Sequence, residues 1–124
     1  MNEARIQDRR GLRQQARISA GQEFHMTVYV IVQLKMTDRA AYDRYQARFF
    51  DVFRKFSGRL LSADEHPLVL EGTWDRDKLV LMSFPDEAAY RAWADSPEYQ
   101  EISKDRKAGA QAVVLLAKGF APRA

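Results

Sequence analysis

Apolar side chains recur with two different periods along residues 28–118, and these periods predict the secondary structure. The segment VYVIVQLKM (28–36) is dominated by β-branched residues, and every second side chain is apolar, which predicts a strand with one buried face. The buried face begins at Val28, while the opposite face changes from apolar at Tyr29 to polar at Lys35. The segment AVVLLAK (112–118) predicts the last strand by the same criterion.

A helix is predicted directly after the first strand. Asp38 supplies a capping oxygen at its start, and Ser57-Gly58 ends it. The large apolar residues of this segment recur at steps of three and four and so share one face of the helix. They are Tyr42, Tyr45, Phe49, Val52, Phe53 and Phe56.

The middle of the chain predicts further strands. The segments RLLSADE (59–65), LVLEG (68–72) and KLVLMSF (78–84) all have strand-like composition. His66-Pro67 interrupts the first two. Because proline cannot donate a hydrogen bond to a sheet, we expect a bulge, a bend or a sheet edge there.

The segment SFPDEAAYRAWADSPEYQ (83–100) predicts two short helices joined at an angle. Asp86 can cap the first, at about 86–94. Ser96 and Pro97 suit the cap and first positions of the second, because proline lacks an N–H that would have no intrahelical partner there. The inward residues of these helices are predicted to be Ala89, Ala92, Trp93, Tyr99 and Ile102.

The predicted order from residue 27 is therefore β-α-β-β-α(α)-β. This is the α+β, ferredoxin-like βαββαβ arrangement, with the second helix split in two and a four-stranded antiparallel sheet. Helices cover one face of such a sheet. The other face is left open, and we expect it to need a partner.

Residues 1–25 differ from the rest and are predicted to form a basic, poorly ordered extension. They contain five arginines against three acidic residues, whereas the whole chain, with 20 basic and 17 acidic residues, has a net charge of only +3. Without this extension little basic excess remains, so nucleic-acid binding is not favoured. Three explanations of residues 1–25 remain open. They are a basic tail, a targeting presequence, or an artefact in which translation really starts at Met26; the tail and the artefact are favoured over targeting. We assign 26–120 to one domain and 121–124 to a tail.

Composition narrows the chemistry further. The chain has no cysteine, so disulfides and thiolate chemistry are excluded and a cytoplasmic location is expected. No apolar run approaches the roughly 20 residues that span a bilayer, so no membrane partner is expected. We find no GxGxxG, GxxxxGK[ST], GxSxG or HExxH motif, and neither a cofactor nor a metal is predicted.

Several segments together resemble the family known as domain of unknown function thirteen-thirty, within the dimeric α+β-barrel group. They are TVYVIVQLKMTDRAAYDRY, SGRLLSADE, VLEGTW, KLVLMSFPDEAAYRAW and DSPEYQ. The resemblance covers about residues 26–120. The chain departs from the family pattern at Arg39, at Ser57-Gly58 and in ADEHPLV, a region that is often glycine-rich in the family.

This resemblance implies a homodimer in which two protomers pack their open sheet faces into a barrel, with a dimer of dimers left open. The wider group contains cofactor-free monooxygenases, muconolactone isomerase-like enzymes and haem-binding dismutases. The family itself has no settled activity, and a shared fold is a weak basis for inferring function.

Candidate ligand-binding residues follow from position and residue type, and each also has a structural explanation. Glu71 and Trp74 can form a pocket wall or close a hairpin, and Tyr29 and Gln33 can face a pocket or the dimer contact. Arg59 can clamp a carboxylate or form a surface ion pair, and Tyr99 is either a pocket phenol or core. His66 beside Pro67 is interpreted as a turn histidine rather than a general base.

The favoured hypothesis is a protein that binds an unknown small organic molecule between sheet and helices, as a cofactor-free enzyme of isomerase or monooxygenase type or as a binder. The alternative is a non-catalytic oligomerisation or partner-docking module whose barrel is filled with side chains. No catalytic residue is assigned.

Overall fold

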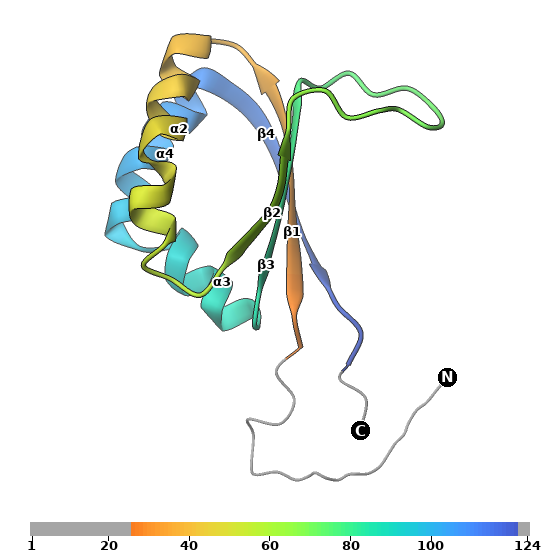
Figure 1. Ribbon diagram of the computed structural model, residues 1–124. Helices are drawn as coiled ribbons and strands as arrows, with labels where there is room; N and C mark the ends of the chain where they lie inside the picture. Colours follow the sequence, from red (N-terminus) through yellow and green to blue (C-terminus); the bar gives the residue numbers. More distant parts are fainter. Residues whose placement is uncertain (1–25, 122–124) are drawn as a thin grey trace, which may run out of the picture.

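A four-stranded antiparallel sheet with helices on one face makes up the described part of the chain (Figure 1). The computed structural model describes residues 26–121. The elements are β1 (Val28–Met36), α2 (Arg39–Phe53), β2 (Arg59–Asp64), β3 (Lys78–Phe84), α3 (Glu87–Ala94), α4 (Pro97–Gly109) and β4 (Ala110–Lys118). The predicted ferredoxin-like order is confirmed, while the extension predicted for 1–25 and the tail beyond 121 lie outside the described residues.

The strands lie in the order β2-β3-β1-β4. In the centre of the sheet Val30 of β1 lies opposite Met82 of β3 and Leu116 of β4. Because side chains alternate along a strand, this register places Val28, Val30, Val32 and Leu34 on the helix-covered face, where all four are buried. The face predicted for the first strand is therefore confirmed.

Each helix begins at the capping residue that the sequence predicts. Asp38 accepts a hydrogen bond from the Ala41 amide, and Asp86 accepts one from the Ala89 amide. The Ser96 hydroxyl accepts one from the Tyr99 amide. The break in the second helical segment is thus the joint between α3 and α4.

The apolar stripe of α2 faces the sheet. Tyr42, Tyr45, Phe49, Val52 and Phe53 are buried, and Phe56 is half-buried against them. From α3 and α4, Trp93, Tyr99 and Ile102 join the same core. The prediction for Ala92 is wrong, because it lies on the exposed side of α3.

The segment between β2 and β3 corrects another prediction. Residues 68–72 were expected to be strand-like, but they belong to a loop that leaves the sheet on the side opposite to the helices (Figure 1). Pro67 cannot donate to a ladder, and the side chains of Leu68 and Leu70 are 82% and 88% exposed. The apolar residues of this segment therefore do not form a strand that pairs with the sheet.

Among residues 26–121, none of the helices combines the length and the apolar character that crossing a lipid bilayer requires.

The end of α4 is packed tightly against the start of α2 at Gly109. Its carbonyl accepts hydrogen bonds from the amides of Thr37 (2.9 Å) and Asp38 (3.1 Å). A Cβ added at Gly109 would meet the backbone of Tyr42 and lie 2.8 Å from the Asp38 carbonyl oxygen. The glycine is therefore required by the close approach of two backbones.

Gly109→Ala should push α4 away from α2 and lower the free energy of unfolding by about 1–3 kcal/mol, the usual cost of overpacking. Equilibrium urea denaturation measures this change. The control is Lys107→Ala on the exposed side of α4, which should stay within about 0.5 kcal/mol of wild type. Equal stability of the two variants would contradict the requirement for glycine at position 109.

Candidate functional site

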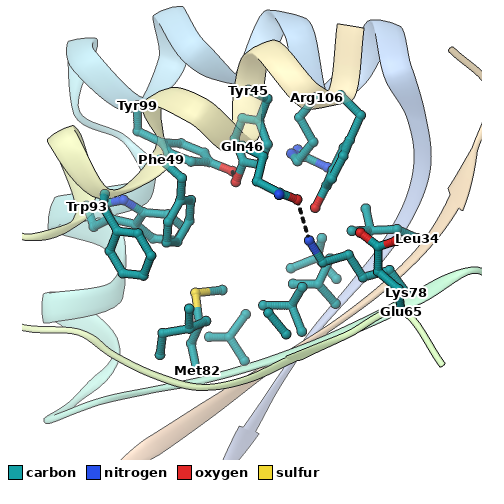
Figure 2. Close-up of a pocket in the computed structure, with 18 of the residues that line it drawn as sticks. Leu34, Tyr45, Gln46, Phe49, Glu65, Lys78, Met82, Trp93, Tyr99 and Arg106 are labelled. Atoms are coloured by element: carbon teal, nitrogen blue, oxygen red, sulfur yellow. Dashed lines mark hydrogen bonds between the residues drawn. The ribbon is translucent and has the colours of Figure 1, made fainter. Parts of the chain in front are cut away.

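A cavity of about 310 Å³ lies between the helices and the covered face of the sheet. Its floor consists of β1 and β3 side chains, among them Val32, Val80 and Met82. Residues of α2, α3 and α4 form its roof (Figure 2). The cavity therefore occupies the space where two packed layers would otherwise meet.

Aromatic rings close one end of the cavity. The ring centres of Trp93 and Tyr99 are 4.2 Å apart, and Phe49 lies 6.0 Å from Trp93. Tyr45 contacts both Phe49 and Tyr99 with edge-on rings. Edge-on and tilted ring pairs of this kind stabilise one another beyond the area they bury, so this end is a rigid apolar wall.

Two phenols meet at the inner surface of this wall. The hydroxyl oxygens of Tyr45 and Tyr99 are 3.1 Å apart and share a hydrogen bond. Burial raises the pKa of Tyr45 well above the usual value for tyrosine, and the neighbouring Tyr99 raises it further. Tyr45 therefore remains a neutral phenol at ordinary pH.

A lysine forms the opposite end. Lys78 is only 5% exposed, and its Nζ donates a 2.7 Å hydrogen bond to Oε1 of Gln46 (Figure 2). The same Nζ lies 4.9 Å from the centre of the Tyr42 ring, within cation–π range. Burial lowers the pKa of Lys78, although Glu65 partly offsets this effect. The sheet thus holds an ammonium group among apolar neighbours.

Glu65 lines the cavity near Lys78 but makes its ion pair elsewhere. Its two carboxylate oxygens accept hydrogen bonds from Arg39 at 2.8 and 3.1 Å. These bonds lower the pKa of Glu65 and keep it ionised. Within residues 26–121, Lys78 has no carboxylate within 4.0 Å.

Two buried N–H groups on the cavity walls have no hydrogen-bond partner in the described part of the chain. They are Nε of Arg106 and Nε1 of Trp93. Arg106 reaches toward the cavity from α4, on the wall opposite Lys78 (Figure 2). Buried donors are normally satisfied, so both groups favour a site that receives acceptor atoms.

Four residues that line the cavity are exposed: Gln46 and Phe50 of α2, Ala63 of β2 and Val114 of β4. Because three of the four lie on α2 and β2, we infer that the mouth of the cavity lies between these two elements. Phe50 is 56% exposed, which is high for so large an apolar side chain. A molecule from solvent would therefore enter past Phe50 and Gln46.

Of the six candidate ligand-binding residues predicted from the sequence, Tyr99 alone lines this cavity. Tyr29 and Gln33 point to the open face of the sheet, opposite to Val30 and Val32. Trp74 Nε1 donates to Gln33 Oε1 at 3.1 Å, which ties the loop to this face.

The two remaining candidates also lie away from the cavity. Arg59 opens the edge strand β2 on the open face, opposite Ser83, and Glu71 is exposed in the loop between β2 and β3. A binding role for these residues stays a prediction. His66 is exposed, and its amide donates to Asp64 Oδ1 at 2.7 Å, which matches the predicted turn.

The sequence analysis missed the polar residues that matter most for this cavity. Lys78 shares the parity of Val80, Met82 and Phe84 along β3, but this strand is apolar on both faces, so its sequence does not reveal which face Lys78 joins. Gln46 and Arg106 give no signal either, because polar residues on helices usually face solvent. Over residues 26–121, no group of three histidine, aspartate or glutamate side chains is placed to hold a metal.

Comparison with known families agrees with this fold. The profile described as "Domain of unknown function (DUF1330)" matches residues 27–120. The chain belongs to the DUF1330 family. No curated protein matches it significantly.

Solved structures show the same fold at low sequence identity. A protein of unknown function from Rhodopseudomonas palustris is 20% identical, with a TM-score of 0.67 over 79% of this chain and 85% of that one. A dabb family protein with a ferredoxin-like fold from Mesorhizobium loti is 14% identical, with a TM-score of 0.57 over 77% and 98%.

A third neighbour carries an activity in its name. SnoaB, a cofactor-independent oxygenase from Streptomyces nogalater, is 14% identical, with a TM-score of 0.55 over 77% of this chain and 94% of that one. At this identity the similarity concerns the fold.

The buried tyrosines predict a loss of stability at alkaline pH. Burial, and next Glu65, raise the pKa of Tyr42 from 10.0 to about 12. A raised pKa stabilises the fold below pH 10 and that contribution disappears as the pH rises through about 12. Two pKa units correspond to roughly 3 kcal/mol.

Urea denaturation at a series of pH values between 9 and 12 measures this effect. Wild type should lose roughly 2 kcal/mol more over this range than Tyr42→Phe, which keeps the ring but cannot ionise. Tyr29→Phe, at a tyrosine that is 38% exposed on the opposite face, should parallel wild type. Identical curves for wild type and Tyr42→Phe would contradict the prediction.

Proposed function

We propose that this DUF1330 protein binds a small organic molecule in the cavity between sheet and helices. The observation that supports this function most is the cavity itself, about 310 Å³ in volume, with apolar walls and polar groups converging at one end. Ligand pockets of soluble proteins start at about 300 Å³ and have this combination of an apolar lining and few polar groups.

The buried lysine favours a binding site over a purely structural core. An ion removed from water costs several kcal/mol unless it is well paired. At position 78 an apolar residue would pack against Leu34 and Val80 without this cost. Among residues 26–121, the buried Lys78 has only the amide of Gln46 as its hydrogen-bond partner, which supports a function for the ammonium group.

A cavity-filling variant tests this proposal. Val80 lies on the floor of the cavity, so Val80→Phe should fill it with an aromatic ring. A library of neutral, anionic and cationic metabolites is screened by thermal shift, and the affinities of the hits are measured by calorimetry. We expect Val80→Phe to weaken every hit by about tenfold or more, that is, by at least 1.4 kcal/mol.

Val80→Ala is the matched control, because it changes the same position and leaves the cavity open. It should retain the hits. Hits that bind Val80→Phe as tightly as wild type would place the binding site elsewhere. An absence of hits on wild type would favour the alternative function, a non-catalytic oligomerisation or partner-docking module.

A second candidate function is a cofactor-free enzyme of isomerase or monooxygenase type. The Tyr45–Tyr99 phenol pair and Lys78 place proton-carrying groups at two ends of one cavity, which is what proton transfer to a bound molecule requires. The name of the SnoaB neighbour agrees with this candidate. Chromatography with mass spectrometry of a bound hit, after incubation in air and under nitrogen, would reveal an oxygenated product by its mass and an isomer by its retention time. An unchanged hit would indicate binding alone.

We also propose that the protein is a homodimer that covers the open face of its sheet with a second copy. This face carries apolar side chains from three strands. Tyr29, Val113 and Leu115 are 38%, 37% and 50% exposed, and the register places Ile31 and Leu81 beside them.

The loop between β2 and β3 supports the same proposal. It projects on the side of the open face and carries exposed Leu68 and Leu70 (Figure 1). A twofold axis would let each loop contact the open face of the other protomer. The open face of the sheet and the apolar side chains of the loop would then both be buried in the dimer.

Leu115→Lys introduces a charge into this face and should shift the protein from dimer to monomer at micromolar concentration. Size-exclusion chromatography with light scattering measures the mass. Ala47→Lys, on the exposed side of α2, adds the same charge away from the face and should remain dimeric. A monomeric wild type would contradict the proposed dimer.

A further inference from the structure

We propose that the ligand of the cavity is a small carboxylate whose body is a single aromatic ring. This inference rests on the proposed function, since it names the chemical class of the molecule that binds there. It follows from three features of the cavity as residues 26–121 form it: an ammonium group without a carboxylate partner, an unsatisfied guanidinium N–H and a wall of aromatic rings.

The ammonium of Lys78 offers the strongest attraction for an anion. Within residues 26–121 its nitrogen contacts the neutral amide oxygen of Gln46 and the face of the Tyr42 ring. The nearest acidic group on the cavity wall, Glu65, is held by two hydrogen bonds from Arg39. A carboxylate in the cavity would give Lys78 a charge-assisted hydrogen bond, the stronger kind of polar contact.

Arg106 adds a second donor from the opposite wall. Its Nε is buried and has no partner within residues 26–121, and no carboxylate in that range forms an ion pair with its side chain. A cationic ligand would meet Lys78 and Arg106 as like charges. A neutral ligand without acceptors would leave Arg106 Nε unpaired and the charge of Lys78 without a counter-ion, which costs binding free energy.

The rest of the cavity fits a flat apolar body. Trp93, Tyr99, Phe49 and Tyr45 present ring faces and edges to it. Its 310 Å³ equals the liquid volume of roughly ten water molecules. A molecule with one aromatic ring and one carboxylate group fits within this volume.

The affinity for a carboxylate should depend on pH through the protonation of Lys78. Burial lowers its pKa below 10.5, Glu65 and Asp43 raise it, and Arg39 lowers it. Benzoate remains ionised over the same range, and Tyr42, with a pKa of about 12, stays neutral. Affinity for benzoate should therefore fall as the pH rises through the lowered pKa of Lys78, below the pH at which an exposed lysine titrates.

The experiment uses Trp93 as a reporter inside the cavity wall. The chain has two tryptophans, so Trp74→Phe leaves Trp93 as the only tryptophan, which is excited at wavelengths that tyrosine does not absorb. Benzoate and its neutral analogue benzamide are titrated into this protein and into three further variants of it, Lys78→Met, Arg106→Leu and Lys104→Met. Lys104 is exposed and pairs with Glu101, so its replacement is the matched control.

We expect benzoate to bind at least about tenfold more tightly than benzamide, a difference of 1.4 kcal/mol or more. Lys78→Met should remove this preference and Arg106→Leu should reduce it, while Lys104→Met leaves it unchanged. Circular dichroism confirms that each variant is folded, and Lys78→Met should fold well because it removes a buried charge.

The outcomes separate the ligand class from the proposed function. Equal affinities for benzoate and benzamide, both weakened by Val80→Phe, would overturn the carboxylate class and leave cavity binding supported. A benzoate preference that survives in Lys78→Met would overturn the role of Lys78. If neither compound changes Trp93 fluorescence at millimolar concentration, the class is wrong, and the metabolite screen decides the proposed function independently.

Discussion

Aromatic packing between the helices and the sheet determines where the cavity is. Trp93 stacks on Phe84 of β3 with ring centres 5.6 Å apart, and Phe53 meets the edge of Trp93 at 5.3 Å. These large rings fill the space near α3 completely, since the side chains involved are at most 4% exposed. Toward Lys78 the facing residues of the sheet are valines, which are shorter. The difference in side-chain size between the two ends therefore leaves a cavity at one of them.

The two ends also differ in polarity, and strand register is the cause. Leu34 of β1 pairs with Lys78 of β3, so the side chain of Lys78 must point to the helix-covered face. Gln46 of α2 lies above Lys78, and its Oε1 accepts a hydrogen bond from Nζ of Lys78. A register shift of one residue would expose Lys78 and bury Leu79 in its place. The unbroken pairing of β3 with β1 from Lys78 to Phe84 opposes such a shift.

Sequence patterns predicted the fold well, because α2 and β1 have strong apolar periodicity and Asp38, Asp86 and Ser96 are clear capping residues. They failed at residues 68–72, where strand-like composition lacked a pairing partner. They also failed at the cavity. Lys78 begins a strand that is apolar on both faces, so composition does not reveal which face it joins. A space left between side chains depends on their three-dimensional packing, which periodicity does not describe.

The parity of β1 separates the two surfaces that the proposals use. Even-numbered residues such as Val30 and Val32 line the cavity, while odd-numbered residues such as Tyr29 and Ile31 face the open side. Substitutions on one face therefore act on ligand binding and those on the other act on assembly. A ligand can influence the open face only through the backbone of the sheet, and Trp74, bonded to Gln33, reports on that face while Trp93 reports on the cavity.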